Sequence, residues 1–364
     1  MTVSDITKCL EAVAPLAYAE EFDNVGLLVG DATAEVTGVL VTLDTLETVV
    51  DEAIAKKCNL IVSFHPILFK GLKKLNGNSY VERTIMKAIK ADVAIYAMHT
   101  ALDNSFQGVN AKLCDVLGLQ NRQILIPKSA TLKKLTTYVP PEHVEQVRNA
   151  LFKAGAGVLG DYSNCSFNSE GFGTYLGNDN SNPALGEKGV LQQEKEFLIS
   201  VIFEKHLEKS MLKALFKAHP YEEIAFDIIL LDNKNRAMGM GMTGELEVAL
   251  DEKEFLLELK KKMNLSCIRH SKLLNKPIKK IAVLGGSGSF AINNAIRAKA
   301  DMYITADVKY HEFYQAENKL VIADIGHFES EQFTKNLIVE ILTKKFPNFA
   351  IILSENTTDP IYYM

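Results

Sequence analysis

Short apolar runs alternate with amphipathic helical patterns along the first third of the chain. The runs are continuous rather than interrupted by polar residues, which is typical of strands buried on both faces of a sheet. The predicted strands are GVLVTL (Gly38–Leu43), LIVSF (Leu60–Phe64) and VAIYAM (Val93–Met98). Helical spacing of apolar positions occurs at Ile6–Tyr18, Leu46–Lys57 and Val81–Lys90. This order predicts an α/β domain in which helices cover both faces of a mostly parallel sheet.

The same alternation of apolar runs and helical patterns occurs in the last third of the chain. The predicted strands there are KKIAVLGG (Lys279–Gly286, with its turn), MYIT (Met302–Thr305) and LVIADI (Leu320–Ile325). Helical patterns follow at Phe290–Ala298 and at Glu329–Lys345. Because both ends of the chain have the same pattern, we expect one sheet built from both.

Between these parts the pattern changes and predicts a different domain. Strand and helix patterns occur in the order β-α-β-β-α-β, which is the order of a ferredoxin-like (split-βαβ) unit. They cover Leu132–Pro140, Pro141–Gly157, a polar turn region at Asp161–Asn182, Glu194–Phe203, His206–His219 and Ile224–Leu231. We therefore predict an inserted ferredoxin-like domain at 128–240, with 1–127 and 241–364 forming the main α/β domain.

Composition narrows the class of protein. A chain of 364 residues is longer than one domain with a single hydrophobic core usually is, so more than one domain is expected. The net charge of −5, without a cluster of basic residues, argues against binding to the phosphates of nucleic acid. The N-terminal stretch lacks the pattern of a signal peptide, and no apolar run reaches the ~20 residues of a membrane helix. The five cysteines are scattered and form no thiolate zinc motif. These features predict a soluble, cytoplasmic protein with reduced cysteines.

Four polar residues lie at or just after the carboxyl ends of predicted strands. They are His65, Asp103, His327 and Glu331. Ligands of α/β sheets bind at this edge, and His327 and Glu331 share one helical face because they are four residues apart. Imidazole and carboxylate ligands without thiolates suit Zn, Mn, Fe or Ni. Each residue alone is as readily a hydrogen-bonded core or capping residue, but the four together favour a metal site.

Other residues near the same edge are weaker candidates. His99, four residues before Asp103, and His311 are candidates for proton transfer. Asp44 and Asp307 also follow predicted strands, whereas Asp23 and Asn24 are interpreted first as turn residues. For each of them, capping or core hydrogen bonding is an equally good interpretation.

The segment GGSGSFA (Gly285–Ala291) fits the GxGxxA dinucleotide pattern, since it follows a strand and precedes a helix. The acidic residue that such a site requires after the next strand is at best Asp307, and no P-loop motif occurs in the chain. The segment is therefore interpreted as a close-packed turn near the metal cleft, whose N–H groups could contact a phosphate. A second, weaker hypothesis for the function is a nucleotide-dependent oxidoreductase, and this turn is its only support.

Five segments together resemble the GTP cyclohydrolase 1 type 2 homolog family, in order along nearly the whole chain. They are EFDNVGLLVG (Glu21–Gly30), SFHPILFKGLKKL (Ser63–Leu75), AMHTALDN (Ala97–Asn104), ITADVKYHEFYQA (Ile304–Ala316) and IADIGHFESEQF (Ile322–Phe333). The resemblance implies a dinuclear metal centre, with the ligands on His65, Asp103, His327 and Glu331, and a toroidal homohexamer. It also implies an insert similar to the PII signal-protein fold. HPYEE (His219–Glu223) is typical of that insert, and is interpreted as a helix end and turn rather than as a second ion site.

One departure from the resembled family concerns the metal site. The family usually has two adjacent histidines before the proline, and the first of these positions is Phe64 here. One of two metal ions should therefore be short of a protein ligand.

These observations predict a protein that binds one or two divalent metal ions per chain. As an enzyme, it would hydrolyse a nucleotide or a phosphorylated small molecule through metal-activated water, with His99 or His311 moving protons. The family name implies the opening of the purine ring of GTP. The alternative is a non-catalytic metal-binding or regulatory hexamer.

Overall fold

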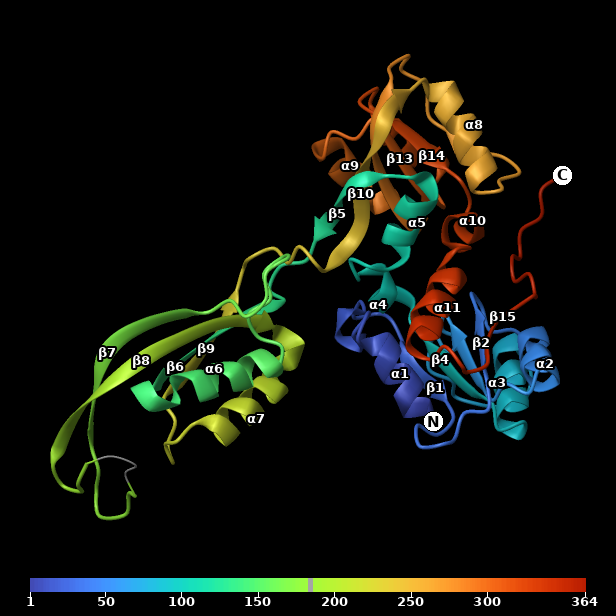
Figure 1. Cartoon of the computed structure of the whole chain (residues 1–364). Helices are drawn as coiled ribbons and strands as arrows, with labels where there is room; N and C mark the ends of the chain where they lie inside the picture. Colours follow the sequence, from blue (N-terminus) through green and yellow to red (C-terminus); the bar gives the residue numbers. More distant parts are fainter. Residues whose placement is uncertain (183–185) are drawn as a thin grey trace. The chain divides into compact units, whose positions relative to one another are not determined.

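The computed structural model describes residues 1–182 and 186–364, which form two compact units. The main unit consists of residues 1–127 and 237–364, and the inserted unit consists of residues 128–236 (Figure 1). The insert was expected to end at residue 240. Gly239 and Met240, however, pair with Pro127 and Ile126 and therefore belong to the main unit.

The first sheet of the main unit has the order β1-β4-β3-β2-β15. Its strands are β1 (Gly26–Val29), β2 (Val39–Thr42), β3 (Leu60–Ser63), β4 (Ala94–Ala97) and β15 (Ile351–Leu353). All pairs are parallel except β1 with β4. Every residue of β2, β3 and β4 is buried, as the continuous apolar runs predict.

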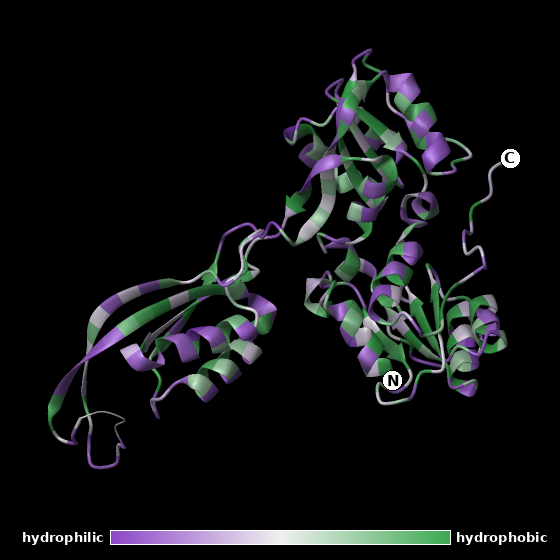
Figure 2. Ribbon diagram, in the orientation of Figure 1, coloured by the Kyte–Doolittle hydropathy of each residue, from purple (hydrophilic) through white to green (hydrophobic). Residues whose placement is uncertain are grey.

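Four helices cover the two faces of this sheet. They are α1 (Val3–Glu11), α2 (Glu47–Ala55), α3 (Tyr80–Lys90) and α11 (Thr334–Lys345). Val39 and Val62 pack into one core with residues of α1 and α11, whereas Leu40 and Ile61 pack with residues of α2 and α3. Adjacent strand residues thus point to opposite covered faces. Figure 2 shows the apolar strands and the mixed polarity of the helices around them.

The second sheet of the main unit has the order β11-β14-β13-β12-β10-β5. Its strands are β5 (Gln120–Pro127), β10 (Gly239–Leu250), β11 (Arg269–His270), β12 (Ile278–Ser287), β13 (Met302–Ala306) and β14 (Val321–Asp324). Strands β12, β13 and β14 are parallel, and the others are antiparallel to their neighbours. The helices α5 (Val109–Leu117), α8 (Glu252–Lys262) and α9 (Ile292–Arg297) supply residues to its cores.

The single sheet expected from both ends of the chain is therefore wrong. The main unit is a mixed α/β fold with two sheets, and each sheet has its own cores. The strands β2, β3 and β4 are bordered by β15 and β1 in the first sheet, and β12, β13 and β14 are bordered by β10 and β11 in the second. These added strands occupy the hydrogen-bonding edges through which the trios would otherwise join.

The inserted unit consists of β6 (Leu132–Val139), α6 (Val144–Lys153), β7 (Phe167–Leu176), β8 (Leu191–Glu204), α7 (Glu208–Ala218) and β9 (Phe226–Leu231). The sheet order is β7-β8-β6-β9, and all pairs are antiparallel. Leu135 and Val201 share a core with Leu151 of α6 and Leu215 of α7. Within the described parts of both units, no helix has the length and apolar character needed to cross a membrane.

Candidate metal centre

Strand ends from both sheets of the main unit supply the predicted site residues. His65 follows β3, and the short helix α4 (His99–Asp103) begins just after β4. The short helix α10 (His327–Glu331) comes after β14 in the second sheet. Each position is at the carboxyl end of a parallel strand, where loops are free of the sheet's own hydrogen bonds.

Three of the four predicted metal ligands lie together. One ligand atom from each of His65, His327 and Glu331 lies within 4.8 Å of the others. Oε2 of Glu331 is 3.1 Å from Nε2 of His65 and 3.3 Å from Nε2 of His327. The Glu331 side chain is only 4% exposed, while the two imidazoles are 23% and 36% exposed. The cluster therefore combines a buried carboxylate with two imidazoles that solvent can reach.

An aspartate holds the far nitrogen of each imidazole. Nδ1 of His65 is 2.8 Å from Oδ1 of Asp44, and Nδ1 of His327 is 2.7 Å from Oδ2 of Asp307. This contact assigns the proton to Nδ1 and leaves the Nε2 lone pair for a ligand role, as in carboxylate–histidine–metal groups. Asp44 follows β2 and Asp307 follows β13, so both orienting groups also come from strand ends.

The carboxylates around the imidazoles create a strongly negative site. Burial would lower the pKa of His65, but Asp44 and Glu331 raise it to about 10. Hydrogen bonding to Glu331 raises the pKa of His327 to about 9, with Asp307 adding to the rise. These shifts mean that the surroundings of both rings stabilise positive charge, whether it is a proton or a metal cation.

One buried oxygen at the site, Oδ1 of Asp103, lacks a hydrogen-bond partner among the described residues. Oε2 of Glu331 has only the two imidazole nitrogens beside it. Burial raises the pKa of Asp103 well above its ordinary value, and the charge of Glu331 raises it further. Buried polar atoms are normally paired, and a carboxylate without a donor is costly unless a cation is close. The donor set of imidazole and carboxylate thus fits a divalent cation of the Zn, Mn, Fe or Ni type.

His99 belongs to a third pair of aspartate and imidazole next to this cluster. Its Nδ1 is 2.8 Å from Oδ1 of Asp23, whose side chain is fully buried. The rings of His65 and His99 have centroids 5.3 Å apart. His99 has a φ of +25°, an unusual backbone conformation of a kind that is often found at functional sites. The sequence interpretation of Asp23 as a turn residue missed its contact with His99, which is 76 positions away.

Phe64 is fully buried in the core that the first sheet shares with α1 and α11. Its ring contacts the rings of His65 and His99, with centroids 4.8 Å and 5.6 Å away. Both carboxylate oxygens of Asp44 are already occupied, Oδ1 by His65 and Oδ2 by the hydroxyl of Thr358. The partly buried ring of His99 is the neighbouring imidazole whose Nε2 has no described hydrogen bond.

His311 lies apart from the cluster in its described contacts. It is exposed in a short helical segment, Tyr310–Ala316, and its ring contacts those of Tyr310 and Tyr314. No described contact joins His311 to His65, His327 or their partners. The structure therefore gives His99, but not His311, a position beside the metal cluster.

The glycine turn after β12 packs against the cluster. Gly286 has a φ of +70°, and a Cβ atom at this position would overlap Oε1 of Glu331. The N–H of Gly286 donates to Oγ of Ser330, and the N–H of Gly285 donates to Oδ1 of Asn110. Because both N–H groups are already bonded within the protein, they do not form a phosphate cradle. The hydroxyl of Ser287 in the same turn donates to Asp307.

In the inserted unit, His219 is held at the end of α7 by backbone contacts. Its Nε2 is 2.9 Å from the carbonyl oxygen of Tyr138, and its Nδ1 is 3.2 Å from the backbone nitrogen of Tyr221. Oε1 of Glu222 accepts a hydrogen bond from the N–H of Asn182. These bonds support the interpretation of HPYEE as a helix end and turn.

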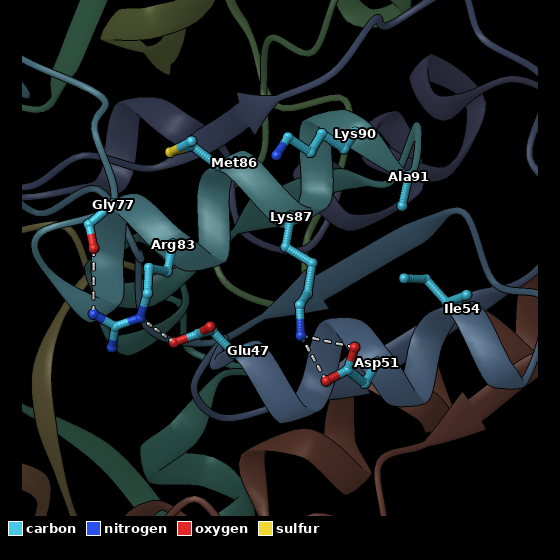
Figure 3. A pocket seen from close by; sticks show the side chains of 9 residues that line it. All are labelled: Glu47, Asp51, Ile54, Gly77, Arg83, Met86, Lys87, Lys90 and Ala91. Atoms are coloured by element: carbon cyan, nitrogen blue, oxygen red, sulfur yellow. Dashed lines mark hydrogen bonds and ion pairs between the residues drawn. The ribbon is translucent and has the colours of Figure 1, made fainter.

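A groove of about 460 Å³ lies between α2 and α3, and none of its lining residues belongs to the cluster (Figure 3). Four of its five charged side chains pair, Arg83 with Glu47 at 2.8 Å and Lys87 with Asp51 at 2.7 Å, which leaves Lys90 without a described partner. The groove therefore presents one lysine outside these pairs and no cluster of imidazole and carboxylate groups.

Comparison with known proteins agrees with the order of the motifs. The profile of Duf34/NIF3 (NGG1p interacting factor 3) matches residues 1–360. A Bacillus subtilis (strain 168) protein named GTP cyclohydrolase 1 type 2 homolog is 39% identical over 366 residues, covering 99% of this chain and 98% of that protein. The Listeria monocytogenes serovar 1/2a protein of the same name is 36% identical over 365 residues, covering 99% and 98%.

Solved structures match over the full length as well. The crystal structure of a Bacillus cereus protein related to NIF3 has a TM-score of 0.88 and 37% identity, covering 100% of this chain and 99% of that one. The Staphylococcus aureus protein SA1388 has a TM-score of 0.77 and 31% identity, with the same coverage. Motif order, sequence identity and fold agree over the whole length, and the chain belongs to the Duf34/NIF3 (NGG1p interacting factor 3) family.

Proposed function

We propose that this protein is a divalent-cation-dependent hydrolase whose cation is held by His65, His327 and Glu331, with Asp103 as a further ligand. The observation that carries the proposal is the convergence of two aspartate-backed imidazoles on one buried carboxylate. A structural ion pair would need only one such contact. Two imidazoles with their Nε2 atoms facing the same oxygen form the donor set of a metal site.

A divalent cation in this site would supply Lewis acidity toward a substrate oxygen and would make water more acidic. The protein's own contribution is orientation and charge. Asp44 and Asp307 fix the ring planes of His65 and His327, while Glu331 supplies buried negative charge that balances the cation.

His99 is the group best placed to exchange protons with a substrate. Asp23 holds its Nδ1, so Nε2 is the atom available for proton transfer. Burial would raise the pKa of Asp23, but hydrogen bonds from His99 and Thr100 lower it to about 2. An ionised aspartate keeps the ring in one orientation, as a proton-transfer residue requires. His311, also expected from the sequence, has no comparable support.

The rim of the site supports an anionic substrate with a flat ring. The ring of Phe69 has its centroid 6.1 Å from that of His99 and 6.3 Å from that of Phe22. Phe69 and Phe22 are 46% and 65% exposed, so each of the two rings can stack on a ligand. Lys70 and Lys73 follow Phe69 on the same exposed loop. Aromatic surface, positive charge and a cation together favour a nucleotide or another phosphorylated molecule.

A second cation is the dinuclear part of the proposal. Asp103 would hold it beside the first ion, and it would bind more weakly because Phe64 contributes no lone pair. Support comes from the unpaired Oδ1 of Asp103. Zn, Mn, Fe and Ni remain equal candidates for either position.

A non-catalytic metal-binding assembly is the second candidate function. Phe64 favours it, since a buried phenyl ring at the cluster removes a ligand position that a two-metal hydrolase would use. In this case the inserted unit would regulate a homohexamer as a ferredoxin-like, PII-like domain. Its support is the β-α-β-β-α-β order and the sheet order β7-β8-β6-β9. Light scattering of the purified protein tests the hexamer, and a monomeric or dimeric mass contradicts it.

The deciding experiment is a turnover assay on metal-reconstituted protein. GTP, other nucleoside triphosphates and simple phosphoesters are incubated with apo protein and with protein loaded separately with Zn²⁺, Mn²⁺, Fe²⁺ or Ni²⁺. We expect hydrolysis only in a loaded sample, and its loss in His99→Gln with cation content unchanged. Cation binding without turnover of any of these substrates would favour the non-catalytic assembly.

A further inference from the structure

The segment 354–364, which follows β15, supplies a hydroxyl group to the metal centre. Thr358 is only 7% exposed, and its Oγ1 donates a hydrogen bond of 2.6 Å to Oδ2 of Asp44. The other oxygen of Asp44 contacts Nδ1 of His65 at 2.8 Å. A continuous chain of contacts therefore leads from Thr358 through Asp44 to the imidazole whose Nε2 faces Glu331.

The beginning of this segment is fixed by a dense set of bonds. The N–H of Ser354 donates to the carbonyl of Val41, which extends the pairing of β15 with β2. The carboxylate of Glu52, on α2, accepts bonds from Oγ of Ser354 at 2.6 Å, the N–H of Glu355 at 2.9 Å and Nδ2 of Asn356 at 2.6 Å. Burial would raise the pKa of Glu52, but these bonds lower it to about 2. Thr358 is thus carried to Asp44 by an anchored backbone.

The far end of the segment reaches the other half of the site. Burial raises the pKa of the Tyr363 hydroxyl, and the nearby carboxylate of Glu329 raises it further through charge and a hydrogen bond. Glu329 lies in α10, the helix that carries His327 and Glu331. The segment therefore contacts groups attached to ligands from both sheets.

We propose that Thr358 is a positioning residue for the metal ligand His65, acting through Asp44. The proposal rests on the cation site proposed above. The torsion of an aspartate carboxylate is broad and nearly two-fold, so one hydrogen bond to His65 leaves its plane poorly fixed. The hydroxyl of Thr358 fixes the second oxygen, which holds Oδ1 toward Nδ1 of His65. Without it, a half-buried carboxylate oxygen loses its donor and the ring orientation of His65 loosens.

Three variants of the full chain test this role. Thr358→Val removes the hydroxyl at nearly constant shape, Thr358→Ser keeps the hydroxyl, and Thr357→Val makes the same change at an exposed neighbouring position. Apo protein is titrated with Zn²⁺ and with Mn²⁺ against a chromophoric chelator. Loss of a direct partner of a ligand weakens metal binding roughly 10- to 100-fold. We expect a smaller loss, of several-fold, for Thr358→Val and binding within about twofold of wild type for the other two.

A spectroscopic readout separates positioning from general stability. The visible spectrum of Co²⁺-loaded protein reports the ligand geometry, and we expect it to change in Thr358→Val but not in Thr358→Ser. In the Asp44→Asn background, Thr358→Val should have no further effect on affinity, because the path to His65 is already broken. If Thr358→Val is insoluble, Thr358→Ala is used in the same titration and spectrum.

The outcomes distinguish this proposal from the proposed function. A wild-type protein that binds no divalent cation overturns the cation site itself. A wild type that binds, with a Thr358→Val variant of equal affinity and unchanged Co²⁺ spectrum, overturns only the role of Thr358. A Thr358→Val variant that unfolds more easily but binds normally shows a purely structural bond, which also overturns it.

Discussion

At the scale of single residues, the buried carboxylates of the candidate metal centre carry the charge that a cation would balance. Glu331 faces two imidazoles, and Asp103 has an oxygen without any described donor. In the absence of a cation, burial and mutual repulsion raise the pKa of Asp103. Both residues are therefore adapted to a cation rather than to packing.

We expect Glu331→Gln and Asp103→Asn each to lower cation affinity at least about tenfold while leaving the fold intact. The amide keeps the shape of the side chain and removes the charge that balances the cation. Elemental analysis after dialysis gives the cation content, and circular dichroism monitors the fold. Glu247→Gln, the same change on an exposed strand position, is the matched control. Unchanged cation content in Asp103→Asn would remove Asp103 from the ligand set.

Phe64 is the residue that sets the number of cations in this proposal. We expect wild-type protein to bind one cation tightly and a second weakly, because the phenyl ring beside His65 and His99 has no lone pair. Phe64→His should tighten the second event in a Mn²⁺ or Zn²⁺ titration of apo protein, whereas Phe64→Leu should not. Two equally tight ions in the wild type would contradict the idea and would indicate that His99 replaces the missing ligand.

At the scale of elements, turns at the strand ends decide whether the ligands can approach one another. Three residues in contact with the cluster, His99, Gly286 and Asp307, have positive φ. Gly286 has no Cβ, and the carboxylate of Glu331 lies in the space that a Cβ would occupy. The position of Glu331 on α10 therefore depends on the absence of a side chain in the tight turn after β12.

We expect Gly286→Ala to destabilise the protein by ~1–3 kcal/mol and to weaken cation binding as well. The alanine Cβ meets a strained φ and displaces Glu331 at the same time. Gly71→Ala is the control, since that glycine has open space around its Cα and no positive φ. Denaturant unfolding and cation titration measure the two effects. A stable variant with unaltered affinity would show that Glu331 does not need its present position.

At the scale of the whole molecule, the predicted cation ligands all belong to the main unit. The insert leaves the main unit after Pro127 and returns before Gly239, and these two residues are paired neighbours on β5 and β10. Antiparallel partners lie about 5 Å apart, so a short linker can join them. The main unit also has its own hydrophobic cores, which include no residue of the insert.

We expect deletion of residues 128–236, with a short Gly/Ser linker in their place, to give a folded protein that still binds a cation. Circular dichroism, thermal unfolding and cation titration check this. A matched deletion of 128–240 should fold less well, because it removes Gly239 and Met240 from the pairing of β10 with β5. An insoluble 128–236 deletion, or a soluble one without cation binding, would show that the main unit depends on the insert.

The local pattern of the sequence was enough to predict several strands and three of the proposed cation ligands. The continuous apolar runs predicted β2, β3, β4, β13 and β14, because strands buried on both faces need apolar residues at every position. Polar residues just after such runs pointed to the carboxyl edge of the strands. This is why His65, His327 and Glu331 could be named before their distances were known.

The tertiary structure alone decided how these pieces combine. The number of sheets depends on which strand edges pair, and short apolar runs do not specify their neighbours; the expected single sheet was wrong for this reason. Asp44 and Asp307 were weaker candidates because they follow predicted strands, but nothing local showed that they hold imidazoles. Asp23 and Thr358 had no distinguishing local signal, since an aspartate or threonine in a turn is usually a capping or turn residue. Their roles arise from contacts across 20 to 314 positions in the chain. The sequence by itself determined the kinds of ligand and the edge where they lie, whereas folding decided their orientation, because hydrogen-bond partners distant in sequence fix each ring.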